Sequence, residues 1–102
     1  MEKEFDQDAD VIFSACKQAV GYIGWEIVNA DVDEFRVTAH TSISWRSFGD
    51  KVEIRVSDKD SSTIVTVSSE PRFSLTNWGK DSTNEGAFLE KLAQEIHRLD
   101  SR

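Results

Sequence analysis

Two segments of the chain combine aromatic rings with cations and small polar residues, a composition that suits a binding surface. They are "SISWRSFG" at residues 42–49 and "PRFSLTNWGKD" at residues 71–81. Aromatic faces stack on planar groups and on cations, while arginine and lysine pair with anions. If the two segments meet in space, we expect a cleft for a small anionic or planar ligand. Its lining would be Trp45, Arg46, Phe48, Arg72, Phe73, Trp78 and Lys80.

The same aromatic residues have a second interpretation, in which they cap the open end of the apolar core. Large rings are seldom left in water without a reason. In that case Gly49 and Gly79 supply the unusual backbone turns that bring the rings inward. Replacing Trp45 or Trp78 by alanine would then lower the stability, whereas replacing the neighbouring arginines would have no effect. Both interpretations stay open from the sequence.

The residues that catalyse reactions elsewhere are poorly placed here. Cys16 lies on the apolar side of an expected helix, and reactive thiolates need polar, electropositive surroundings. His40 falls on the polar side of an expected strand and His97 on the exposed side of the last helix, so no thiol–histidine pair is predicted. His40 near Arg36, and Asp81 next to a lysine, are the remaining candidates for a titratable group with a shifted pKa. We therefore expect a protein that is not an enzyme and has no cofactor.

Asp6, Asp8 and Asp10 are spaced like the start of a calcium-binding loop. That loop needs glycine at its sixth position and glutamate at its twelfth, where this chain has Val11 and Lys17. Helix capping accounts for these acids better. The sequence also contains no phosphate-binding glycine loop, zinc-ligand spacing or dinucleotide fingerprint. No metal site is expected.

Charge and composition narrow the classes of partner. The 102 residues carry a net charge of −7, which argues against nucleic-acid binding because phosphates attract basic surfaces. Residues 1–35 hold nine acids and two bases, whereas residues 36–80 hold seven bases and five acids. No stretch is apolar enough to cross a membrane. The acidic N-terminus shows no signal peptide, and with a single cysteine the simplest expectation is a cytoplasmic location.

The spacing of apolar residues predicts the helices and strands that would position the two segments. A helix is expected from a cap at Asp8 or Asp10 to a stop at Gly21 and Gly24, because short carboxylates cap helix starts and glycine closes helix ends. Its buried stripe comprises Ile12, Ala15, Cys16, Ala19, Val20 and Ile23. A second helix is expected after the capping box formed by Ser82 and Glu85. Its stripe comprises Phe88, Leu89, Leu92, Ala93, Ile96 and Leu99.

Between the helices, apolar and polar residues alternate with the period of two that is typical of half-buried strands. The strands are expected around Trp25 and Ile27, at 35–40, at 51–56 and at 63–69, with turn residues at 58–62 and a stop at Pro71. We predict an α+β two-layer fold: a single domain over residues 1–102. Its antiparallel meander has four strands, or five if residues 3–5 form one. Both helices pack on one face, so that Val37, Ile54 and Val67 meet Ile12 and Leu92.

Residues 24–39 and 50–92 resemble the uncharacterised bacterial family called domain of unknown function 1499. The similar pieces are the lead "GWEIVNADVDEFRVTA", the strands at 50–56 and 63–69, Arg72, and the element "NWGKD" at 77–81 before the last helix. The family's own element has the order Asp-x-Gly-x-Asn, so the acid and the amide are exchanged here. The resemblance implies the same α+β fold and no known activity.

Two functions follow as hypotheses. The first is a small non-enzymatic ligand-binding or interaction domain that uses segments 42–49 and 71–81. The second is an acidic protein partner, such as an inhibitor or an immunity protein, because charge concentrated in the first third can steer association with a basic protein. The polar sheet side, with Arg36, Thr38, His40, Glu53 and Arg55, is expected to face water. An exposed strand edge is a further place for pairing, but sequence does not identify the edge.

Overall fold

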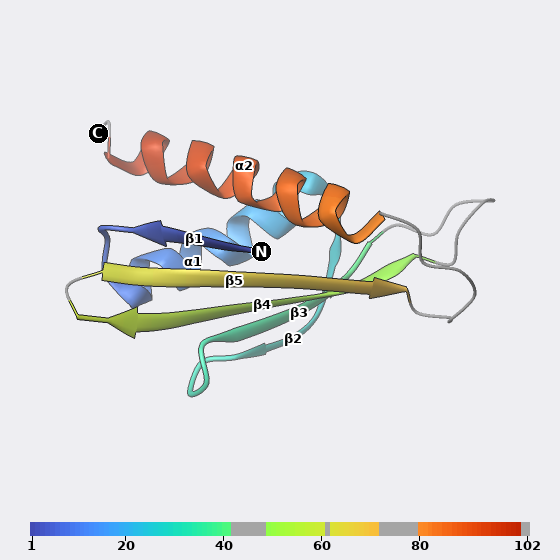
Figure 1. Ribbon diagram of the computed structural model, residues 1–102, viewed down its shortest axis with the longest axis horizontal. Coiled ribbons are helices and arrows are strands. Elements are labelled where there is room, and N and C mark those ends of the chain that lie inside the picture. Colours follow the sequence, from blue (N-terminus) through green and yellow to red (C-terminus); the bar gives the residue numbers. More distant parts are fainter. Residues whose placement is uncertain (42–48, 61, 72–79, 101–102) are drawn as a thin grey trace.

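The computed structural model describes residues 1–41, 49–60, 62–71 and 80–100; the side chains of residues 70–71, 80–84 and 100 lie outside this description. Two helices and five strands follow one another along the chain (Figure 1). Their bounds are β1 Glu2–Phe5, α1 Ala9–Ile23, β2 Glu26–Asp31, β3 Arg36–His40, β4 Asp50–Lys59, β5 Ser62–Pro71 and α2 Lys80–Asp100.

All five strands belong to one antiparallel sheet with the order β1-β5-β4-β3-β2. Strands β2 to β5 form the predicted meander, in which each strand pairs with the next along the chain. The short N-terminal strand pairs with β5 at the far side of the sheet, so the four-strand version of the prediction was one strand short. The α+β class, with an antiparallel sheet and two helices, is confirmed.

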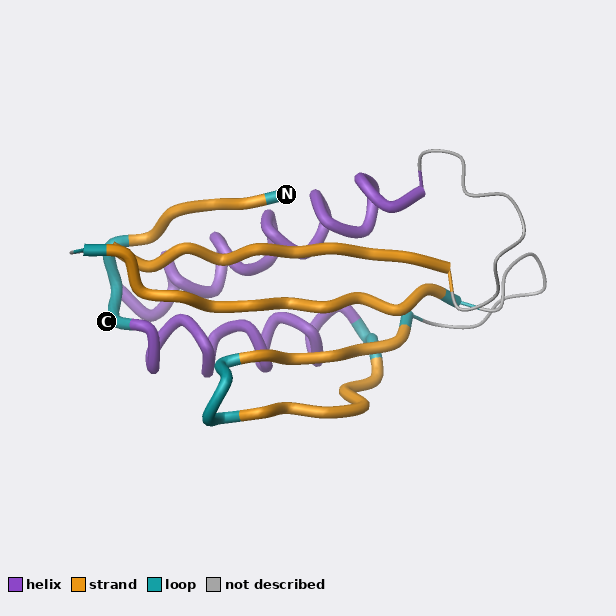
Figure 2. The backbone as a smooth tube through the Cα atoms, turned by 60° about the horizontal axis from the view of Figure 1, so that its bottom comes forward, coloured by secondary structure: helices purple, strands orange, loops and turns teal. Residues whose placement is uncertain are grey.

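Both helices lie on the same side of the sheet (Figure 2). The strand residues Val37, Ile54 and Val67 are fully buried and belong to one apolar cluster with Ile12 of α1 and Leu92 of α2. Burial of such a side chain contributes about 1.5–3 kcal/mol relative to leaving it in water. The alternation seen in the sequence thus records a sheet that is apolar on one face, as predicted.

The ends of α1 agree only partly with the predicted caps. Asp8 is the N-cap residue, but its side chain makes no capping hydrogen bond, so its position and not its bonding was predicted correctly. Gly24 closes the helix in the left-handed conformation, with φ 96°, and its N–H donates to the carbonyls of Val20 and Gly21. The prediction of Gly21 as a stop was wrong, because Gly21 still lies inside the last turn of α1.

The start of α2 differs from the predicted capping box. The helix begins at Lys80, so Ser82 and Glu85 lie inside its first turns and not at its boundary. The carboxylate of Glu85 instead lies 3.2 Å from the amino group of Met1, next to β5. Glu85, which the local pattern assigned to helix capping, therefore makes an ion pair with a residue far away in the sequence. The apolar stripe of α2 is confirmed, with Phe88 and Leu92 fully buried.

Strand β2 departs from the predicted half-buried pattern. Every residue from Glu26 to Ala30 is exposed, and the pairing with β3 shifts register between Ile27 and Asn29. This β-bulge breaks the simple alternation. The half-buried aromatic at this point is Trp25, which precedes β2 and stacks on Phe88 with ring centroids 6.3 Å apart. Ile27 faces the same side of the sheet as the buried Ala39, as predicted, but it is exposed, so the prediction that it is buried was wrong.

Candidate functional site

The residues predicted to line a cleft are not placed by the structure. Lys80 is the first residue of α2, but its side chain lies outside the description. The other predicted site residues fall in segments 42–48 and 72–79, which lie outside the described residues: Trp45, Arg46, Phe48, Arg72, Phe73 and Trp78. Gly79, predicted to make a turn, lies there as well. The structure does describe the strands to which both segments are attached.

Both segments leave the sheet at the same end. Segment 42–48 runs between Thr41 and Gly49, and segment 72–79 begins after Pro71, the last residue of β5. Asp50 and Pro71 are paired neighbours on β4 and β5. The N–H of Thr41 donates to the carbonyl of Asp50 at 2.9 Å, which brings the end of β3 to the same place (Figure 1). Three neighbouring strands thus bring together both ends of segment 42–48 and the start of segment 72–79.

Hydrogen bonds between Thr41 and Asp50 hold together the two ends of segment 42–48, next to Gly49. The N–H of Asp50 donates to Oγ1 of Thr41 at 2.7 Å, in addition to the bond between their main chains. Gly49 is buried and has φ 88°, a conformation that side chains rarely adopt. A Cβ atom on Gly49 would lie 2.8 Å from the carbonyl oxygen of Thr41. Only glycine fits at this point, as the sequence predicted.

Replacing Gly49 by alanine should therefore lower the free energy of unfolding by at least about 1–2 kcal/mol, the usual cost of a left-handed residue with a side chain. The contact with the Thr41 carbonyl adds to this cost. Gly86 is the matched control, because it lies within α2 and a Cβ there meets nothing within 4 Å. Gly86→Ala should stabilise by about 0.5–1 kcal/mol. Urea unfolding measures the stability of both variants. A Gly49→Ala variant as stable as the parent would contradict the close packing of Gly49 against Thr41.

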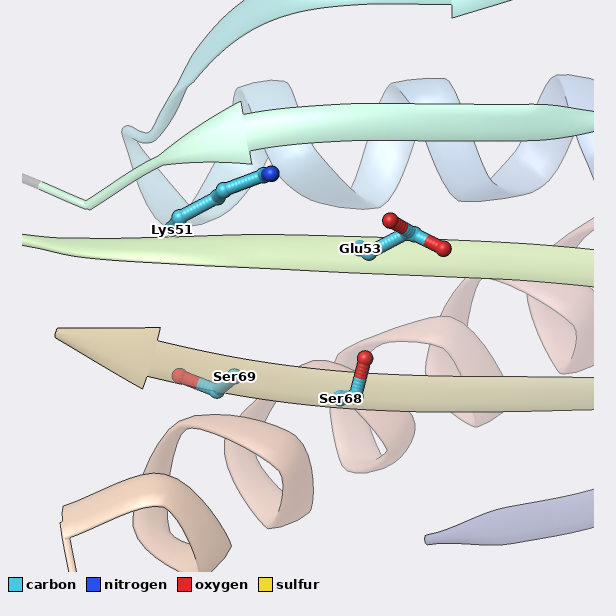
Figure 3. Close-up of a pocket in the computed structure, with 4 residues that line it drawn as sticks. All are labelled: Lys51, Glu53, Ser68 and Ser69. Atoms are coloured by element: carbon cyan, nitrogen blue, oxygen red, sulfur yellow. The ribbon is translucent and has the colours of Figure 1, made fainter. Parts of the chain in front are cut away.

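A hollow of about 210 Å³ lies next to this end of the sheet, between β4 and β5. Lys51 and Glu53 contribute from β4, and Ser68 and Ser69 from β5. Lys51, Glu53 and Ser68 lie on the outer face, and Glu53 is the register partner of Ser68 (Figure 3). Ser69 is buried and belongs to the other face. On the outer face the hollow thus offers the ammonium of Lys51, the carboxylate of Glu53 and the hydroxyl of Ser68, groups that bind small polar molecules by hydrogen bonds.

The outer face around this hollow is the predicted polar side of the sheet. The register pairs Arg36 with Arg55 and Thr38 with Glu53, so these side chains share one face. Like charges directly opposite one another are unfavourable. The Nε–H of Arg55 donates to Oε1 of Glu53 at 2.7 Å, which offsets that repulsion locally. Arg55 is well exposed to water and Glu53 is half-buried, so this surface ion pair adds little stability.

The structure gives no support to a catalytic thiol. Cys16 is fully buried in the apolar cluster, and this burial raises the pKa of its thiol to about 12. A thiol with that pKa remains protonated at neutral pH and is a poor nucleophile. His40 lies on the outer face of β3, on the side of the sheet away from the core that holds Cys16. The interpretation of Cys16 as a core residue is confirmed.

A group of carboxylates at the opposite end of the sheet was not foreseen. Asp6 and Asp8, between β1 and α1, share a hollow of about 110 Å³ with Asp58, near the end of β4, and Asp60, in the β4–β5 turn. Asp8, Asp10, Asp58 and Phe35 line a second hollow of about 330 Å³ beside it. No group of His, Cys, Asp or Glu among the described residues is arranged to hold a metal ion. We call this region, with its five aspartates, the acidic end.

The acidic end could not be read from sequence because it joins two turns that are about fifty residues apart in the chain. Thr63 connects them, since its Oγ1–H donates to the carbonyl of Gln7 at 2.7 Å. The only signal in the sequence was that both turns are rich in aspartate.

Comparison with protein-family models and with curated proteins finds no match for this chain. The resemblance to domain of unknown function 1499 therefore stays a prediction. Among the described residues, neither helix combines the length and the apolar character that crossing a membrane requires.

Proposed function

We propose that this protein is a small non-enzymatic binding domain, and that its ligand contacts lie at the sheet end where segments 42–48 and 72–79 depart. The register of Asp50 with Pro71 carries the proposal, because it tethers both segments to neighbouring strands. The described residues from which both segments depart, Thr41, Gly49 and Pro71, therefore lie at one end of the sheet. Lys51 adds a described cation beside the adjacent hollow.

The proposed ligand is a small anionic or planar molecule. Arg46 and Arg72 would supply the positive charge, and the rings of Trp45 and Trp78 would supply stacking surfaces. Residues 36–80, which contain both segments, are the part of this acidic protein with a net positive charge, +2. An anion meets the least repulsion there.

Thermal unfolding in the presence of phosphate, sulfate, citrate and nucleoside monophosphates, at low ionic strength, tests this proposal. A ligand at 100 times its Kd stabilises the folded state by about 2.7 kcal/mol. In a domain of this size each kcal/mol raises the Tm by about 4–8 °C, so even weak binding is measurable. We expect at least one of these anions to raise the Tm, and Arg46→Ala together with Arg72→Ala to abolish the rise.

Lys3→Ala together with Lys59→Ala is the matched control, because it also removes two positive charges, from exposed residues outside both segments. It should leave the ligand-induced rise unchanged. The core-capping interpretation predicts a different result: Trp45→Ala and Trp78→Ala lower the Tm of the free protein, and no anion raises it. That outcome, or a rise that survives the loss of both arginines, would contradict the binding proposal.

A second function, an acidic partner of a basic protein, is favoured by the acidic end. Its five aspartates gather around two neighbouring hollows on the side of the molecule away from Asp50 and Pro71. Concentrated negative charge speeds association with a basic surface and makes it sensitive to salt. This function would use the opposite end of the sheet from the ligand proposal.

Affinity capture from the native host at low salt tests the second function. The expected result is a basic protein that the parent retains, that salt releases, and that an Asp58→Asn, Asp60→Asn variant loses. Glu90→Gln together with Gln94→Glu serves as a control for the procedure, because both residues are exposed on α2 and their exchange leaves the net charge unchanged. Capture of no basic protein, or equal capture by the aspartate variant, would speak against this function.

A further inference from the structure

Strand β2 is the outermost strand of the sheet on the side opposite β1. In Figure 2 the two helices lie behind the inner strands, whereas β2 runs beyond them. Its six residues are accordingly exposed, except for the half-buried Asp31. No strand among the described residues pairs with its outer edge. The main-chain N–H and C=O groups of an edge strand that point outward can pair with another chain.

Apolar side chains gather on this edge strand. Ile27 is 40% exposed, Val28 is 51% exposed, and Val32 in the following turn is 63% exposed. They are three of the six large apolar residues that are exposed in the described part of the chain. Ile27 pairs with the buried Ala39, so the apolar face of the sheet continues outward past the helices. Apolar side chains concentrated on an unpaired edge are typical of an interaction surface.

The charges around β2 identify the kind of partner. The chain from Gln18 to Phe35 contains four acids and no base. Glu26 and Asp31 lie near the two ends of β2. Oδ1 of Asp31 accepts the N–H groups of Asp33 and Glu34 at 3.1 and 3.2 Å, which fixes the turn with both of these residues exposed. On its inner side β2 pairs Asp31 with Arg36 of β3, whereas a strand on its outer edge meets apolar side chains between Glu26 and the acidic 31–34 turn.

The same charges disfavour a second copy of this chain as the occupant. A symmetric antiparallel pair centred on β2 would place Glu26 of each copy opposite Asp31 of the other. Like charges directly opposite on paired strands are unfavourable, and here they would occur twice. A partner with lysine or arginine opposite Glu26 and Asp31 is instead attracted by these two carboxylates.

We propose that the outer edge of β2 binds an extended segment of a basic protein, in which lysine or arginine alternates with apolar residues. The segment adds as a further strand of the sheet. Its apolar side chains contact Ile27 and Val28, and its cations lie near Glu26 and the 31–34 turn. The bulge at Val28 interrupts regular pairing, so the edge suits one short segment. This site is separate from both regions discussed under the proposed function and does not depend on either.

The test uses the full chain and a short capped peptide that alternates lysine with valine. Two control peptides are matched to it: one carries glutamate in place of lysine, and one keeps the sequence but is N-methylated at alternate residues. The N-methyl groups preserve the charge and block the main-chain bonds of strand addition. We expect only the unmodified basic peptide to bind, and amide hydrogen exchange of residues 26–31 to slow in the complex.

Charge variants of the protein complete the experiment. Glu26→Lys should raise the Kd for the basic peptide about fivefold more than Glu90→Lys. Glu90 is exposed on α2, so the two variants change the net charge equally and should both keep the fold by circular dichroism. Equal effects of the two variants, equal binding of the N-methylated peptide, or slowed exchange at residues 2–5 instead of 26–31 would overturn the proposal. A dimer of the free protein that Val28→Lys dissociates would also overturn it, because the occupant would then be a second copy.

Discussion

The apolar contact between one face of the sheet and two helices holds every other part of this protein in place. Val37, Ile54 and Val67 are fully buried in one apolar cluster that includes residues of both helices, among them Ile12 of α1 and Leu92 of α2. Both helices lie on this one side of the sheet, and neither covers the other face. The outer face, the two ends of the sheet and the outermost strand are therefore left open to contacts with other molecules.

That division places different chemistry at different parts of the molecule. The end at Asp50 and Pro71 carries the departure points of the two aromatic and cationic segments. The other end gathers the aspartates of the β1–α1 connection and the β4–β5 turn. The ladder between β4 and β5 lies between these two ends, so the two proposed functions would use different parts of the molecule.

Much of the fold could be predicted because its signals are local. Alternation along 51–56 and 63–69, and the stripe from Phe88 to Leu99, each report the side of one element that faces the core. The failures arose where a distant contact decided the outcome. Glu85 pairs with the amino group of Met1, although the local pattern made it part of a helix cap. Ile27 alternates correctly with its neighbours, but β2 extends past the helices and leaves it exposed.

The candidate sites were harder to predict than the fold, for the same reason. Asp58 and Asp8 meet only because the register of β4 with β5 and of β5 with β1 brings two remote turns to one end. Periodicity contains no information on strand order, so neither the acidic end nor the free edge of β2 could be located from the sequence. The buried position of Cys16, by contrast, followed from its spacing within a single helix, and the structure confirms it.

Methyl–methyl nuclear Overhauser effects test the one-sided cover most directly. The methyl groups of Val37, Ile54 and Val67 should show contacts to methyl groups of α1 and α2, including those of Ile12 and Leu92. The methyl groups of Thr38, Ile64 and Thr66, which alternate with buried neighbours on the outer face, should show none to either helix. Contacts from both sets of residues to the helices, or from the outer set alone, would contradict this structure and the sites placed on it.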